Sequence, residues 1–318
     1  MSELRSAAET AVEQCLALET DESCVVVTDD ERESIGEALY AVASEITDDA
    51  TLVKYPPGEQ HGGEPPAPVA AALAGSDAFL APTTKSLSHT RARSDATDGG
   101  SRGATLPGIT ESVFVTGLDA DYDRILAECE RTLECVAGAD EVRVTTDRGT
   151  DITFEIGNRE WFDDTGDVSE SGSFSNLPAG EVFVSPESAD GRYVVDGTMR
   201  PHGLLENETL EFVVEDGLVT EISDDEIREQ VEAAAADVDD AAYNLAELGI
   251  GTNVGVTDLV GSVLLDEKAA GTVHIAIGDN AGIGGETEAP LHLDGIIRDP
   301  RVFVDGEELE LPAADRPD

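Results

Sequence analysis

The stretch CVVVTDDERESIGEALYAVASEITDDATLVKY, residues 24–55, decides the architecture of the first half of the chain. Residues 24–27 form a β-branched run and residues 51–55 a second extended segment. Between them, apolar residues recur at helical spacing over residues 31–46. A strand, a long helical crossover and another strand are typical of parallel pairing, so this stretch predicts a parallel sheet covered by helices.

The second half follows a different pattern, with short strands and tight turns. Asp147–Gly149 and Glu215–Gly217 each separate two extended segments, which predicts two β-hairpins. We therefore expect an α/β protein of two domains. Residues 1–137 form an N-terminal α/β domain with a parallel sheet, and residues 138–318 form a strand-rich α+β domain that carries the functional site.

The charge of the chain is strongly one-sided. The 318 residues include 69 Asp and Glu against 19 Lys and Arg, a formal net charge of −50, while 40% of the residues are hydrophobic. This composition predicts a folded, cytoplasmic protein with an acidic surface adapted to concentrated salt, which screens self-repulsion. It argues against nucleic acid or an anionic membrane as a partner, and no apolar run has the length of a membrane span.

Several common catalytic motifs are missing from the sequence. It contains no GxSxG nucleophile elbow, no GxxxxGK[ST] phosphate loop, no HExxH zinc motif and no CxxC pair. Serine hydrolase, P-loop and zincin chemistry therefore have no support.

Two of the five histidines suggest a metal site. In LHLDG, residues 291–295, His292 and Asp294 are two apart, so on a strand both project from one face and can share an ion. His274 lies in the alternating segment GTVHIAIG, where it is either a buried structural histidine or a ligand. Spacing alone does not single out Glu181 or Glu247 among 69 acidic residues.

Four ordered segments resemble the signature blocks of the thermophilic metallo-aminopeptidase family, of the leucyl aminopeptidase or aminopeptidase T type. They are NLPAGEVFVSP (176–186), ELGIGTN (247–253), LDEKAAGTVHIAIG (265–278) and LHLDG (291–295). Residues 82–110 are similar to a further block of this family, so the resemblance extends from about residue 80 to the end.

The resemblance implies a two-domain homodimeric enzyme that releases N-terminal amino acids from small peptides. It implies two divalent ions, Zn, Co or Mn, and a water that they activate as the nucleophile. Carried over by motif, the metal ligands are Glu181, Glu247, His274, His292 and Asp294. The two glutamates are also the candidate catalytic residues, and one of them would serve as general base.

Two departures from the aminopeptidase pattern favour an alternative. Residues 275–285 contain no tyrosine, which those enzymes carry after the first histidine, and the spacing from His274 to His292 is shorter. The same fold family includes 2,5-dihydroxypyridine dioxygenase, in which two histidines and one carboxylate bind a single Fe(II). His274, His292 and Asp294 would supply that triad. A third hypothesis is a binding or structural protein that retains the metal site without peptidase chemistry.

Overall fold

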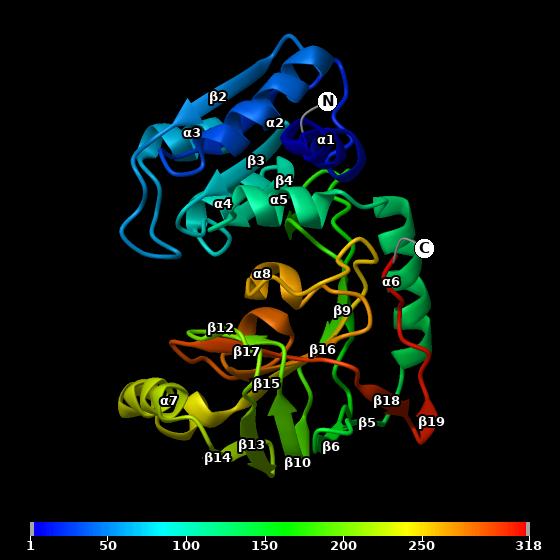
Figure 1. The fold of residues 1–318 in the computed structure, drawn as a ribbon. Coiled ribbons are helices and arrows are strands. Elements are labelled where there is room, and N and C mark those ends of the chain that lie inside the picture. Colours follow the sequence, from blue (N-terminus) through cyan, green and yellow to red (C-terminus); the bar gives the residue numbers. More distant parts are fainter. Residues whose placement is uncertain (1–2, 316–318) are drawn as a thin grey trace. The chain divides into compact units, whose positions relative to one another are not determined.

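Residues 3–315 are described by the computed structural model shown in Figure 1. The chain forms two compact units. The first extends to Leu126 and also includes Asp164–Ala179, and the second includes Ala127–Asp163 and continues from Gly180. The division into domains at residue 137 remains a prediction, because these units are discontinuous in sequence.

The first unit is built on a five-stranded sheet of order β2-β1-β3-β4-β8, in which every neighbouring pair is parallel. The predicted parallel α/β architecture is therefore confirmed. Glycine is required at one point of the sheet, because a Cβ on Gly103 would lie 2.0 Å from the carbonyl oxygen of its partner Phe79. The strands are β1 Cys24–Thr28, β2 Ala50–Lys54, β3 Ala78–Thr83, β4 Arg102–Pro107 and β8 Phe174–Asn176.

Helices cover both faces of this sheet (Figure 1). On one face, Val25, Val27 and Phe79 pack against Val69 and Leu73 of α3. On the other, α2 contacts β1 and β2 and packs together with α1 and α5. The helical elements are α1 Glu3–Glu9, η1 Thr10–Cys15, α2 Glu33–Ile46, α3 Ala67–Ala74, α4 Arg91–Asp98 and α5 Glu111–Leu118.

The chain returns to the first unit after it has entered the second. Helix α6, Tyr122–Val136, crosses the boundary at Leu126, and the chain comes back at Asp164 to add β8 beside β4. A strand of three residues is too short to be recognised in a sequence, because an alternation of apolar and polar residues over so short a segment cannot be distinguished from chance.

The second unit contains an antiparallel sheet of order β14-β13-β10-β6-β5-β18-β19. Both predicted hairpins, β5–β6 and β13–β14, are present in it. Asp216 and Gly217 turn the second hairpin with φ values of 50° and 77°, the left-handed pair that a tight hairpin turn requires. The strands are β5 Glu141–Thr145, β6 Asp151–Glu155, β10 Ser188–Val195, β13 Leu210–Glu215, β14 Leu218–Ile222, β18 Arg301–Val304 and β19 Glu307–Glu308.

A second sheet of the same unit has the order β12-β11-β17-β16-β15-β9-β7. Its strands β15 and β16 are buried along their whole length. The strands are β7 Phe162–Asp164, β9 Glu181–Val184, β11 Thr198–Met199, β12 Gly203–Leu204, β15 Leu245–Gly251, β16 Val273–Gly278 and β17 His292–Ile297. The remaining helical elements are α7 Asp225–Val238, η2 Asp239–Tyr243, α8 Val263–Asp266 and η3 Ala281–Ile283.

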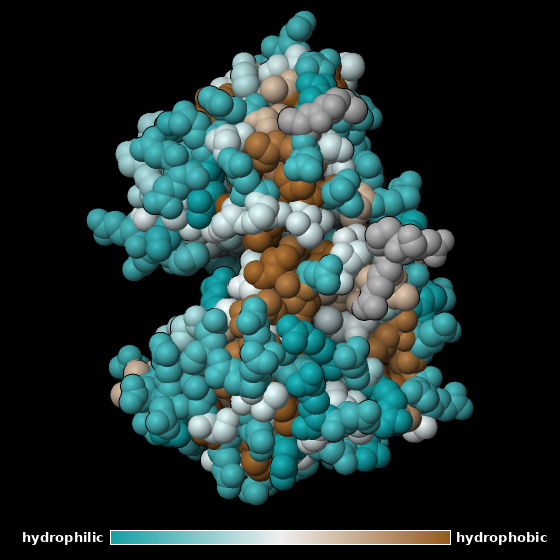
Figure 2. Space-filling view, in the orientation of Figure 1, coloured by the Kyte–Doolittle hydropathy of each residue, from teal (hydrophilic) through white to brown (hydrophobic). Residues whose placement is uncertain are grey.

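Helix α7 illustrates how the acidic composition is placed. Ile227, Val231 and Ala234 form its buried stripe, while Glu229 and Asp237 are exposed. The surface around α7 is mainly hydrophilic in Figure 2. Within residues 3–315, no helix has both the length and the apolar character needed to cross a membrane.

We expect the stability of the protein to rise with salt concentration, because salt screens the repulsion among surface carboxylates. The double variant Glu229→Lys/Asp237→Lys should be more stable than the wild type in dilute buffer by about 0.5 kcal/mol per site, and this advantage should shrink in molar salt. Thermal unfolding monitored by circular dichroism over a KCl series measures both effects. Equal stability of the wild type at low and high salt would contradict the halophilic interpretation.

Candidate metal centre

Strand register brings the five predicted ligands to one face of the second sheet. Glu247 on β15 lies opposite Ala276 on β16, which lies opposite Asp294 on β17. Glu181 begins β9 opposite Gly251, and His292 lies opposite Gly278. Because side chains on one face recur every second residue, these positions share a face with His274. The sheet thus gathers residues from four segments of the chain.

Small residues alternate with the candidate ligands on this face and leave room for them. His274 lies opposite Gly249, and a Cβ on Gly249 would be 2.1 Å from both Cε1 and Nε2 of the imidazole. Gly251, Ala276 and Gly278 are the other small neighbours. The glycines of ELGIG and VHIAIG are therefore the local signal that accompanies these ligands in the sequence, although a glycine alone does not identify an adjacent glutamate as a ligand.

The ligand atoms form two overlapping groups that share Glu247. In the inner group, Nε2 of His274 lies 3.3 Å from Oε2 of Glu181 and 3.3 Å from Oε1 of Glu247. In the outer group, Nε2 of His292 lies 3.2 Å from Oε2 of Glu247 and 3.2 Å from Oδ1 of Asp294. The two histidines thus belong to different groups, and Glu247 connects them.

The two groups differ in their access to solvent. The side chains of His274 and Glu247 are 1% and 8% exposed, whereas that of His292 is 33% exposed. Asp294, at 14%, also lies nearer the surface. The outer group is therefore the side from which an ion and a substrate can approach.

Hydrogen bonding prepares the imidazole of the outer group for metal binding. Nδ1 of His292 lies 2.7 Å from the carbonyl oxygen of Asp279, which can only accept, so Nδ1 carries a proton and Nε2 is the nitrogen that can bind an ion once its own proton is lost. In the inner group, Oε2 of Glu181 and Nδ1 of His274 are buried and have no hydrogen-bond partner in the described structure. An unsatisfied carboxylate oxygen beside an imidazole nitrogen is the pattern expected where an ion binds.

The spacing of these atoms fits a divalent ion. Metal–nitrogen and metal–oxygen bonds of about 2.0–2.2 Å place neighbouring ligand atoms roughly 3.0–3.5 Å apart. The four N···O separations of 3.2–3.3 Å lie within this range. Carboxylates and imidazoles also suit Zn, Mn and Fe ions. The five residues therefore have the chemistry and the spacing of a metal centre, and their assignment as ligands remains a prediction.

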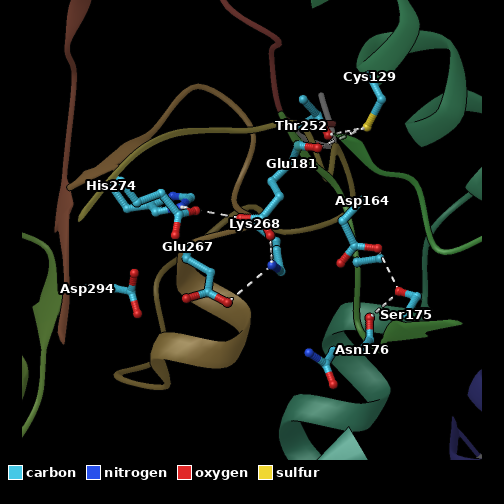
Figure 3. Close-up of polar contacts among 12 residues, drawn as sticks. Cys129, Asp164, Ser175, Asn176, Glu181, Thr252, Glu267, Lys268, His274 and Asp294 are labelled. Carbon is cyan, nitrogen blue, oxygen red and sulfur yellow. Dashed lines mark hydrogen bonds and ion pairs between the residues drawn. The ribbon is translucent and has the colours of Figure 1, made fainter. Parts of the chain in front are cut away.

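Two charged residues beside the centre were not anticipated from the sequence. Lys268 is buried, and its Nζ contacts Oε1 of Glu181 and lies 3.2 Å from Oε1 of Glu267 (Figure 3). Both residues follow α8 directly. Lys268 is one of only three lysines in the sequence, and this scarcity was the one available signal.

The pKa values of the cluster reflect buried charges that compensate one another. Burial raises the pKa of Glu181 to about 7, although Lys268 and His274 oppose the shift. Burial acts in the same direction on Glu247, but hydrogen bonds from the two histidines hold its pKa below the usual range. For His274, burial lowers the pKa, yet Glu247 and Glu181 outweigh it and raise the pKa to about 9. An ion that bound here would therefore displace protons from the site.

Two of the other three histidines, His61 and His202, make contacts elsewhere. Nε2 of His202 is 3.1 Å from Oδ1 of Asp224, whose side chain also caps α7. Nδ1 of His61 accepts a hydrogen bond from the backbone of Ser86 in the first unit. Neither belongs to a group of potential metal ligands in the described structure.

Comparison with known proteins adds a family and a fold. The sequence matches the family described as NicX, 2,5-dihydroxypyridine 5,6-dioxygenase, over residues 3–310. The structure is similar to that of 2,5-dihydroxypyridine dioxygenase from Pseudomonas putida KT2440, with a TM-score of 0.78 and 20% identity over 100% of this chain and 99% of that chain. No curated protein matches the sequence.

A second similar structure is that of wild-type AmpT from Thermus thermophilus. The TM-score is 0.69 and the identity 19%, over 96% of each chain. At such low identities the two structures show a shared fold, and the activity of either is not transferred by similarity alone.

The glycine beneath His274 provides a test of the packing in the inner group. We expect Gly249→Ala to lower the free energy of unfolding by about 1–3 kcal/mol, because the new methyl group overlaps the imidazole and forces it aside. Denaturant unfolding in high salt measures this loss. The matched control is Gly282→Ala, whose Cβ meets no atom within 4 Å. Equal stabilities of the two variants would show that the imidazole does not occupy the position described.

Proposed function

This chain belongs to the 2,5-dihydroxypyridine 5,6-dioxygenase family, and on this premise we propose that it is an iron-dependent dioxygenase that opens the ring of a dihydroxylated N-heteroaromatic substrate. The observation that carries the proposal is the family match over residues 3–310, which includes both units. The aminopeptidase, which was the main expectation from the sequence, becomes the second candidate function. The dioxygenase, which was the alternative, becomes the first.

The five clustered side chains would hold the ion. Fe(II) held by these residues would supply the electrons that activate O₂. We extend the expected triad of His274, His292 and Asp294 to include Glu247, which lies between the two histidines. Glu247 therefore belongs to the centre of the ligand set in this proposal.

The protein's own residues would orient the ligands and move a proton. Asp279 fixes the tautomer of His292, and Glu247 contacts both imidazoles. Of the two candidate catalytic glutamates, Glu181 is better suited to act as general base toward a ring hydroxyl. Burial raises the pKa of Glu181 to about 7, whereas hydrogen bonds from the two histidines hold the pKa of Glu247 below its usual range.

One observation favours the aminopeptidase as the second candidate function. The two groups that share Glu247 resemble a pair of sites with a bridging carboxylate, an arrangement that suits two divalent ions. The fold similarity to AmpT agrees with this possibility. In this case the bound ions would be Zn, Co or Mn, and the substrate would be a small peptide. The protein would then be the homodimeric cytoplasmic enzyme predicted from the sequence.

Activity assays separate the two candidates. After anaerobic loading with Fe(II) in high salt, we expect the protein to consume 2,5-dihydroxypyridine and O₂ in equal amounts, measured by ultraviolet absorbance and an oxygen electrode. The same preparation loaded with Zn, Co or Mn should not hydrolyse leucyl peptides. Peptide hydrolysis without loss of dihydroxypyridine would reverse the order of the candidates.

Substitution of the outer group tests the ligand assignment. We expect His292→Ala and Asp294→Ala to lose bound metal and at least about 100-fold in activity, because each removes an ion ligand. Far-UV circular dichroism in high salt should remain that of the wild type. His61→Ala, which alters a histidine far from the centre in sequence, should keep both metal and activity, and His202→Ala should keep both as well. Full metal content in His292→Ala would refute the assignment.

A further inference from the structure

We propose that a cavity in the first unit binds a small organic carboxylate with a flat, apolar body, and that Lys85 pairs with the charge of this ligand. The cavity has a volume of about 510 Å³, which is within the range of small-molecule sites. Its walls come from the loop that follows β2, residues 55–66, and from Lys85 and Leu87 in the loop that follows β3. The inference goes beyond the proposed function, because the candidate metal ligands all belong to the second unit.

The two loops lie where ligands bind in parallel α/β sheets. Because β1 lies between β2 and β3 in the sheet, the loops that follow these strands meet beyond the carboxyl end of β1, and ligands bind outside such ends. The N–H of Gly62 donates to the carbonyl oxygen of Ser86 over 2.9 Å. Both oxygens of Glu64 accept hydrogen bonds from the backbone of Arg91 and Ala92 at the start of α4. The walls are therefore held together before a ligand binds, which reduces the entropy lost on binding.

Lys85 supplies the positive charge of the cavity. It is half-buried, and within residues 3–315 it forms no ion pair. Both other lysines are paired with carboxylates, Lys54 on β2 and Lys268 beside α8. In a chain with 69 acidic residues, a lysine that none of them neutralises can pair with an anion from solution.

The sequence around Lys85 lacks acidic residues. Residues 78–94 are the longest stretch of the chain without Asp or Glu. The first part of this stretch is the buried strand β3, from which charge is excluded in any case. The stretch continues, however, through the loop and the first turn of α4, and it includes Arg91 and Arg93. This part of the first unit therefore repels an anion less than the rest of the acidic chain does.

Two acidic residues also line the cavity, and neither neutralises Lys85. The carboxylate of Glu64 is engaged by the backbone N–H groups of α4, which compensate its charge. Glu59 is exposed, so water and salt screen its charge. The half-buried ammonium of Lys85 is therefore the charge that a ligand inside the cavity would meet.

The remaining walls decide which anion fits. They are mainly rings and an aliphatic side chain, namely Tyr55, Pro56, Pro57, Pro65, Pro66 and Leu87. Such walls pack against a flat apolar body. A phosphate is best bound by several donors at once, but here one ammonium faces the ligand and the N-terminus of α4 is already engaged by Glu64. A carboxylate on an aromatic body therefore fits better than an inorganic anion.

Ligand-observed fluorine NMR with para-fluorobenzoate as the probe tests the inference on the full chain in high salt. We expect Lys85→Met to weaken binding about 10-fold or more, because the charge of the probe loses its partner. Lys85→Arg, which retains the charge, should restore most of the affinity. The matched control is Lys54→Met, which should bind the probe like the wild type. Equal affinities of the wild type and a folded Lys85→Met would overturn the inference, and so would the absence of binding at millimolar probe.

Competing ligands test the two halves of the proposed chemistry. Neutral para-fluorobenzamide should bind the wild type about 10-fold more weakly than the benzoate does, because it lacks the charge. Acetate, which lacks the apolar body, should displace the probe poorly. Displacement by inorganic phosphate at lower concentrations than by benzoate would overturn the assignment to a carboxylate. Should Lys85→Met fail to fold, the comparison of benzoate with benzamide on the wild type decides, and equal affinities would refute the role of Lys85.

The position of the probe is tested separately. Hydrogen exchange should be slowed by benzoate at residues 55–66 and 84–90, and protection confined to other segments would contradict the proposal. Asp294→Ala, which alters the metal centre, should bind the probe like the wild type. Loss of binding in that variant would place the probe at the metal centre instead. These measurements need no turnover, so their outcome does not depend on the ring-cleavage assay.

Discussion

Convergence of buried carboxylates is the constraint on which the rest of the second unit depends. Glu181, Glu247 and Asp294 meet on one face of a sheet, and Glu267 lies beside them. Like charges at such distances cannot persist in a poorly hydrated interior without cations or shared protons. The two histidines and Lys268 meet part of this demand, and the raised pKa of Glu181 shows that the compensation is incomplete. A divalent ion bound there would complete it.

The sheet makes this concentration of charge possible through its register. Successive strands place a ligand opposite a small residue, as His274 lies opposite Gly249 and His292 opposite Gly278. Long side chains can then converge above the sheet while the strands beneath remain closely paired. The opposite face stays apolar, with Leu248, Ile275 and Ile277 buried completely. Packing on one face and chemistry on the other follow from the alternation of a single set of strands.

The acidic surface and the acidic centre are physically different uses of the same residue type. On α7 the carboxylates are solvated, and their mutual repulsion is relieved by salt. At the metal centre, burial excludes both water and salt, so each carboxylate needs a specific partner. This contrast explains why the overall charge carried no information about the site. An abundance of surface acids hides the few that are buried, because all share the same local pattern.

By itself the sequence determined the parallel α/β architecture of residues 24–55, both hairpins of the second unit and the projection of His292 and Asp294 from one face of a strand. Each of these depends on periodicity or turn chemistry within a few residues, where local preference and burial agree. The candidate ligands Glu181 and Glu247 came from family resemblance. Only the tertiary structure showed that Glu247 connects the two histidines, that Lys268 pairs with Glu181, and that β8 returns the chain to the first unit. These features arise from contacts between segments far apart in the chain, whose register is set by the packing of the whole sheet and leaves no local pattern.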